Sequence, residues 1–208
     1  MIHSSSSEIE PRGKPAEAQQ PSLGPRAEAA VRQLVEAIGE DPRRPGLRST
    51  PRRVAESLAF LTEGYSADLD LILGAAIFEE DYDELVLVRD IGFYSLCEHH
   101  LLPFFGVAHV GYLPHGRLVG LSKLPRVVDA FSRRLQVQER MTSEIAQAIQ
   151  GYLAPRGVGV VIEADHLCTM MRGVRRPGNR TVTSSMTGIF RRDARTRAEF
   201  MDLIRGGR

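Results

Sequence analysis

The apolar residues near the start of the chain recur every three or four positions, which is the spacing of one helical face. The first such set is Ala30, Val31, Leu34, Val35 and Ile38. A second helix is predicted from Thr50, because Thr50 is a suitable N-cap and Pro51 fits the first helical position. We therefore expect residues 27–75 to form N-terminal helices.

After Gly64 the pattern changes to short runs rich in β-branched residues, which predict strands. The predicted strands are 85–90, 106–113, 157–165 and 181–190, and the predicted helices are 122–131, 141–153 and 193–205. Pro125 is acceptable in the first of these helices only if it falls in the first turn. Hairpin-like strand pairs with helices grouped between them predict an α+β fold with an antiparallel sheet, over residues 80–205.

Residues 1–26 differ from the rest, since they hold four of the twelve prolines, five serines and few large apolar residues. Such a segment buries too little surface to offset its ordering entropy, so we expect a disordered tail before a domain at 27–208.

Charge and composition exclude several classes of protein. The 27 basic and 26 acidic residues give a net charge of +1, so nothing favours nucleic acid or an anionic membrane as partner. There is no apolar run of transmembrane length and no signal-peptide pattern. With two cysteines, the chain is not a disulfide scaffold, and we expect a protein of a reducing compartment, the cytoplasm.

Both cysteines lie beside histidines, although the chain has only six histidines. Cys97 and His100 stand three residues apart in CEHH, close enough to hold one ion from a single turn. His166 and Cys168 are two residues apart, so on an extended segment they would face the same side of the sheet. Two thiols and one imidazole would leave the fourth position of a tetrahedral zinc open, as in catalytic sites.

Other interpretations of these residues remain open from the sequence alone. The two cysteines could form a disulfide, or they could be small buried apolar residues. A structural zinc could also take His99 or His166 as its fourth ligand. Neither GxxxxGK[ST] nor GxGxxG occurs, so any nucleotide chemistry would use neither a P-loop nor a Rossmann turn.

Four separated motifs resemble GTP cyclohydrolase I in order and spacing, over residues 28–205. They are SLCEHHLLPFFGVAHVGYLP, VGLSKLPRVVDAFSRRLQVQERMTSEIA, VVIEADHLCTMMRGV and TVTSSMTGIFR. The resemblance implies a tunnelling fold, a homodecameric ring and active sites between subunits. It also implies that GTP is opened hydrolytically to formate and 7,8-dihydroneopterin triphosphate, which feeds pterin or folate synthesis.

The resemblance assigns roles to matching positions. It implies that Cys97, His100 and Cys168 hold one zinc per subunit, with His99 and His166 as catalytic histidines. It implies that Glu139, in LQVQERM, accepts hydrogen bonds from the guanine edge, and that its neighbour Gln138 also contacts the substrate. The positions implied to meet ribose and triphosphate are Ser122, Lys123, Arg126, Arg172 and Arg53.

Two positions depart from the family pattern, namely Leu124-Pro125 and Glu56, which stands where some members have a basic residue. They put one phosphate contact in doubt. Two other functions also stay open: a zinc enzyme of the same fold acting on another purine or pterin, and a catalytically silent ring that binds nucleotide.

Overall fold

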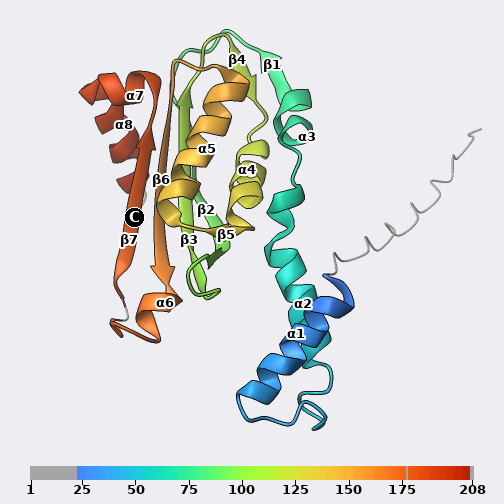
Figure 1. Cartoon of the computed structure of the whole chain (residues 1–208). Helices are drawn as coiled ribbons and strands as arrows, with labels where there is room; N and C mark the ends of the chain where they lie inside the picture. Colours follow the sequence, from blue (N-terminus) through green and yellow to red (C-terminus); the bar gives the residue numbers. More distant parts are fainter. Residues whose placement is uncertain (1–22, 177, 207–208) are drawn as a thin grey trace, which may run out of the picture.

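The computed structural model describes residues 23–176 and 178–206, so most of the expected tail lies outside the described residues. The first elements are helical: α1 (Gly24–Ala37), α2 (Thr50–Leu61), the 3-10 turn η1 (Glu63–Ser66), α3 (Leu69–Leu73) and the 3-10 turn η2 (Gly74–Ala76). Helices α1 and α2 lie side by side as a hairpin that extends away from the rest of the chain (Figure 1). The expected N-terminal helices are thus confirmed, although α1 begins inside the segment expected to be a tail.

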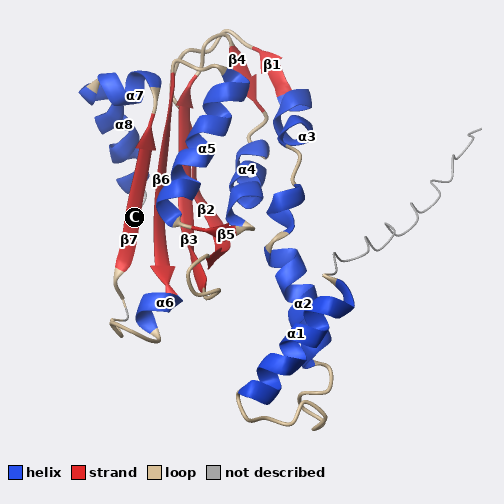
Figure 2. Ribbon diagram, viewed as in Figure 1, coloured by secondary structure: helices blue, strands red, loops and turns tan. Residues whose placement is uncertain are grey.

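A five-stranded sheet forms the body, in the order β5-β2-β3-β6-β7 (Figure 2). Its strands are β2 (Val86–Cys97), β3 (Pro103–Leu113), β5 (Leu135–Gln136), β6 (Gly157–His166) and β7 (Arg180–Met186). All neighbours are antiparallel except the short β5, which runs parallel to the end of β2. A second small sheet pairs β1 (Ile77–Glu79) with β4 (Arg117–Val119). The expected α+β fold with an antiparallel sheet is confirmed.

Helices α4 (Lys123–Ser132) and α5 (Gln138–Leu153) cover one face of this sheet (Figure 1). Helix α5 buries residues at intervals of four, namely Met141, Ile145, Ile149 and Leu153. Alternate residues of β6 supply the facing layer: Val158, Val160, Ile162 and Ala164. The apolar residues of α5 and β6 therefore pack into one core. Pro125 falls in the first turn of α4, as expected.

The opposite face is covered at one end by α7 (Gly188–Arg192) and α8 (Ala194–Arg205). Phe190 and Phe200 meet there edge to face, with ring centroids 5.5 Å apart. A Cβ added to Gly159 would lie 3.0 Å from the Phe200 ring, so glycine lets the ring approach the sheet. The helices therefore form a main layer on one face and a smaller layer on the other.

The strand predicted at residues 181–190 is wrong in its second half. Strand β7 ends at Met186, and Gly188 has a φ of +50°. A Cβ on Gly188 would lie 2.0 Å from the Arg156 carbonyl oxygen. This backbone conformation suits glycine, and it turns the chain into α7.

Candidate functional site

The first half of the candidate site is a tight turn between β2 and β3. The Cys97 carbonyl accepts the backbone N–H groups of His100 at 3.3 Å and Leu101 at 2.8 Å. The Cys97 N–H in turn donates to the Leu102 carbonyl at 2.9 Å. These bonds hold Cys97 and His100 on one turn, as their spacing predicts.

The second half comes from the end of β6. Strand β6 ends at His166, and Cys168 lies in the one-turn helix α6 (Leu167–Met170). The prediction that His166 and Cys168 share an extended segment is therefore wrong, because the chain turns helical directly after His166. This turn carries the Cys168 thiol to the β2–β3 turn.

The ligand atoms of Cys97, His100 and Cys168 all lie within 4.8 Å of one another, and in the described part of the chain this is the one group of such residues that could hold a metal ion. Both cysteines are free and only 7% exposed. A disulfide is therefore not present, and the two thiols point toward a shared space rather than into separate parts of the core.

The spacing of the donor atoms suits a tetrahedral ion. The Cys97 Sγ and His100 Nδ1 atoms are 3.7 Å apart. A sulfur and a nitrogen bound to one tetrahedral zinc would be separated by about 3.6 Å. Burial raises the pKa of the Cys168 thiol, and the nearby Cys97 raises it further. A bound cation would act in the opposite sense, because it favours the thiolate.

His99 and Glu98 occupy the outer side of the same turn. The His99 side chain is 65% exposed, and its Nδ1 lies 3.9 Å from Cys97 Sγ. Glu98 forms an ion pair with Arg140, which lowers the pKa of the Glu98 carboxyl. The Arg140 Nε also donates to Gln136 Oε1 at 3.1 Å, so the turn is fastened to the start of α5.

His166 is held between a ring and an amide. Its imidazole stacks on Phe104 with centroids 4.7 Å apart and an interplanar angle of 1°. Its Nε2 lies 2.7 Å from Gln138 Oε1. Burial lowers the pKa of His166, and the charges of Glu139 and Asp165 partly oppose that shift. A lowered pKa favours the neutral imidazole near pH 7.

The two neighbours at the start of α5 point differently. The Gln138 side chain is 1% exposed and enclosed by protein atoms, whereas Glu139 is exposed. Arg172, just after α6, is also exposed, and its Nη1 lies 3.4 Å from the Cys168 carbonyl oxygen. Arg172 therefore lies beside the Cys–His–Cys group, and Glu139 lies close enough to His166 for its charge to oppose the lowering of the His166 pKa.

The remaining substrate candidates lie elsewhere. Ser122 and Lys123 follow β4, which is fastened to the other end of α5 by an Arg117 Nη2 bond to the Leu153 carbonyl at 2.9 Å. With 16 residues, α5 is about 24 Å long. Arg53 lies on α2, in the N-terminal hairpin. One chain therefore does not place Ser122 or Lys123 beside its own Cys–His–Cys group.

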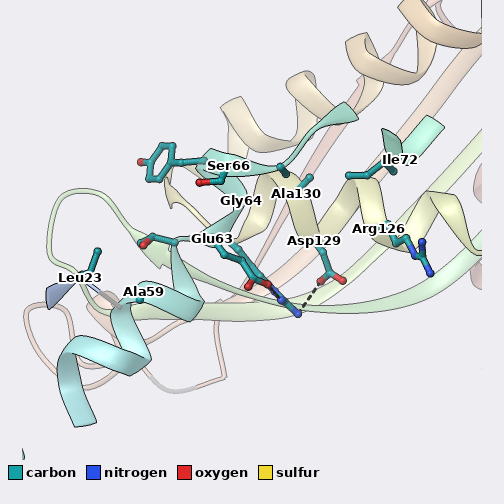
Figure 3. A pocket seen from close by; sticks show the side chains of 13 residues that line it. Leu23, Ala59, Glu63, Gly64, Ser66, Ile72, Arg126, Asp129 and Ala130 are labelled. Carbon is teal, nitrogen blue, oxygen red and sulfur yellow. Dashed lines mark hydrogen bonds and ion pairs between the residues drawn. The ribbon is translucent and has the colours of Figure 1, made fainter. Parts of the chain in front are cut away.

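Arg126 lines a cavity of about 760 Å³ between η1, α2 and α4 (Figure 3). Arg133 spans this cavity, paired with Glu63 and 3.7 Å from Asp129, whose pKa is raised by burial. None of the cysteines or histidines in the described residues lines it. The cavity is therefore separate from the candidate metal site.

The family departure at Glu56 and the substrate candidate Ser122 each have a local structural consequence. Glu56 pairs with Arg52 at 3.4 Å, one turn away on α2. Ser122 stands at the N-cap of α4, but its side chain makes no capping hydrogen bond. Glu56 thus neutralises one cation of α2, and the Ser122 hydroxyl is not used by its own helix.

Several contacts at the site could not be inferred from the sequence. Phe104 stacks on His166, Thr142 and Thr183 bond to Gln138, and Glu98 pairs with Arg140. Residues 181–185 form a largely polar run, which by itself suggests no more than bonding between strands. Thr183 instead faces a helix, with its Oγ1 2.7 Å from Thr142 Oγ1.

Comparisons with known proteins agree over most of the chain. The family model described as GTP cyclohydrolase I matches residues 27–205. A GTP cyclohydrolase 1 of Synechococcus sp. (strain JA-3-3Ab) is 59% identical over 184 residues, covering 88% of this chain and 80% of the relative. The GTP cyclohydrolase 1 of Leptospira biflexa is 57% identical over 180 residues, covering 86% and 98%. That of Dictyostelium discoideum is 55% identical over 181 residues, covering 87% and 78%.

Proposed function

Because the chain belongs to the GTP cyclohydrolase I family, we propose that it opens the guanine imidazole ring of GTP by hydrolysis. C8 leaves as formate, and the product is 7,8-dihydroneopterin triphosphate, at the start of pterin or folate synthesis. The observation that carries the proposal is the meeting of Cys97, His100 and Cys168 with His166 at one end of the sheet. Simple packing gives no reason for that arrangement.

The proposed metal is zinc, one ion per chain, held by Cys97, His100 and Cys168. Two thiolates and an imidazole are ligands that zinc prefers, and three protein ligands leave one position open. When bound, such an ion polarises the substrate and lowers the pKa of water, which suits attack on a weak electrophile such as C8. The free cysteines also fit a reducing compartment, so we place the reaction in the cytoplasm.

The chain's own residues would share binding and proton transfer. Glu139 is exposed at the start of α5, where its carboxylate can accept two parallel N–H groups of guanine. His166 would move protons during ring opening and formate release, with Phe104 fixing its plane. His99, exposed beside Cys97, is the second candidate for proton transfer.

The triphosphate would be bound by cations from more than one chain. Arg172 lies near the metal group, whereas Lys123, Arg126 and Arg53 lie on α4 and α2. We therefore propose a site that is completed by a neighbouring copy, within a homodecameric ring of tunnelling-fold subunits. The edge position of β7 supports such an assembly, since no strand of the described residues pairs with its outer side and an edge strand can pair with a neighbour.

The experiment is incubation of purified protein with GTP, followed by assays for formate and for the fluorescent oxidised pterin. We expect both products from GTP and neither from ATP, which lacks the guanine amine. Activity should be lost with a zinc chelator and restored by zinc. Tight GTP binding without formate would contradict the proposal and support the silent ring, and formate from another purine alone would support the other enzyme.

Nothing in this reaction requires a membrane. In the part of the chain described, every helix is too short or too polar to cross a bilayer.

A further inference from the structure

The Gln138 amide is buried in an environment that fixes its orientation. Its Nε2 lies 3.1 Å from the Ile162 carbonyl oxygen and 3.2 Å from the Thr181 carbonyl oxygen. Backbone carbonyls only accept hydrogen bonds, so the NH₂ group must face them. The reversed amide would place two oxygens against its own and leave buried acceptors unpaired. The Gln138 Oε1 therefore faces His166.

The neighbouring hydroxyls support the same direction of bonding. Thr142 Oγ1 donates to the Gln138 carbonyl at 2.6 Å, which uses its only hydrogen. Thr183 Oγ1 must then donate to Thr142 Oγ1, 2.7 Å away. Thr183 Oγ1 therefore accepts a hydrogen bond from Gln138 Nε2, 3.1 Å away. Each hydroxyl thus has one acceptor, and the two hydrogens of Gln138 Nε2 face three oxygen atoms that can accept them.

One contact remains, between Gln138 Oε1 and His166 Nε2 at 2.7 Å. The amide oxygen can only accept, so His166 Nε2 carries the hydrogen. A neutral imidazole then has its lone pair on Nδ1. Stacking on Phe104, at 4.7 Å, prevents the ring from tilting away from this bond.

We propose that Gln138 is a positioning residue that holds His166 in the Nε2–H tautomer, so that His166 exchanges its catalytic proton at Nδ1. Among the described residues, no protein group bonds Nδ1. The inference rests on the proposed function for the identity of the reaction. It gives Gln138 a role through His166 rather than the direct substrate contact expected from the sequence.

The first test is the tautomer itself, measured by magic-angle-spinning NMR on wild-type protein labelled with ¹⁵N- and ¹³C-histidine. His166→Asn identifies the His166 signals by their loss. We expect hydrogen on Nε2 and an unprotonated Nδ1 in the neutral ring. Hydrogen on Nδ1 would overturn the proposal, and the tautomer itself is read from the wild-type protein.

The second test compares Gln138→Met, which removes the acceptor, with Gln150→Met, which removes another amide of α5, bonded to Pro155 and Thr187 at the end of the helix far from His166. We expect Gln138→Met to lower kcat by about 10- to 100-fold with KM changed less than about threefold. Gln150→Met should stay within about threefold of wild type. Equal losses in both variants would show a merely structural role and overturn the proposal.

The two proposals fail in distinguishable ways. If wild-type protein releases no formate from GTP, the proposed function is wrong whatever the tautomer of His166. If wild-type protein is active but His166 carries its hydrogen on Nδ1, only the positioning role of Gln138 is wrong.

Discussion

The N-terminal end of helix α5 and the surfaces that carry the candidate phosphate cations are built in opposite ways. Around Gln138 the polar side chains are buried and bonded to one another, and His166 is held on two sides. Arg53 and Arg126 are exposed, and among the described residues neither side chain pairs with a carboxylate. The region around Gln138 is organised within a single chain, whereas the arginine side chains are left free to bind a ligand or a neighbouring chain.

The difference follows from the physics of neutral and charged groups. An amide or a neutral imidazole can be buried at little cost once its hydrogen bonds are made. A guanidinium without a partner stays in water, because its desolvation is far more costly. The buried group around Gln138 and His166 can therefore form before substrate binds. The triphosphate site, in contrast, would be completed only by the ligand and a neighbouring chain.

The largest expected effect comes from removing a metal ligand. Cys168→Ser should lose the bound metal and at least about a thousandfold of turnover, because a hydroxyl is a poor substitute for a thiolate. The fold should persist, since the sheet and α5 share a core of their own. Elemental analysis and formate release measure this, with Thr169→Ala as a control in the same short helix. Full metal content in Cys168→Ser would contradict the assignment.

His166→Ala should have the next largest effect. Turnover should fall by about two to four orders of magnitude, while GTP and zinc still bind, because proton transfer belongs to the transition state. Calorimetry and a formate assay separate binding from chemistry. His115→Ala, which removes an exposed histidine, is the control and should match wild type. A His166→Ala enzyme that works at the wild-type rate would exclude the role.

A mixed-subunit experiment tests whether the two regions meet across chains. His166→Ala and Arg126→Glu should each be inactive, the latter by on the order of a hundredfold, through repulsion of the triphosphate. If neighbouring chains share a site, co-expressing both variants should restore about a quarter of wild-type activity, since random mixing leaves that fraction of sites intact. Activity that stays at the level of the single variants would indicate a site within one chain.

Glu139→Gln should have the smallest effect of the four. The amide replaces one acceptor by a donor facing a guanine N–H, a mismatch that typically costs about 1–3 kcal/mol. GTP affinity should therefore fall by roughly tenfold or more, with metal content unchanged. Calorimetry measures it, and Glu199→Gln on the exposed side of α8 is the matched control. Unchanged affinity would remove Glu139 from the guanine site.

Local sequence determined most of the elements and the first half of the site. The buried apolar residues recur every four positions in α5 and alternate in β6, and both patterns can be recognised from neighbouring residues alone. The spacing of Cys97 and His100 likewise predicts a turn, and the backbone bonds of Cys97 to His100, Leu101 and Leu102 all lie within residues 97–102. The apolar patterns and the backbone hydrogen bonds of Cys97 all join residues only a few positions apart. The local sequence is therefore enough to specify them.

Tertiary structure decided the rest, because the deciding contacts join residues far apart in the chain. Strand β7 stops where Gly188 meets the Arg156 carbonyl, which no pattern in residues 181–190 reveals. Cys168 lies in a one-turn helix instead of a strand, and the length of α5 separates Ser122 and Lys123 from the Cys–His–Cys group. Gln138 faces inward because His166, 28 residues later, and Thr183, 45 residues later, supply its hydrogen-bond partners. A buried polar side chain takes its direction from the groups that satisfy it, and only the folded chain brings those groups together.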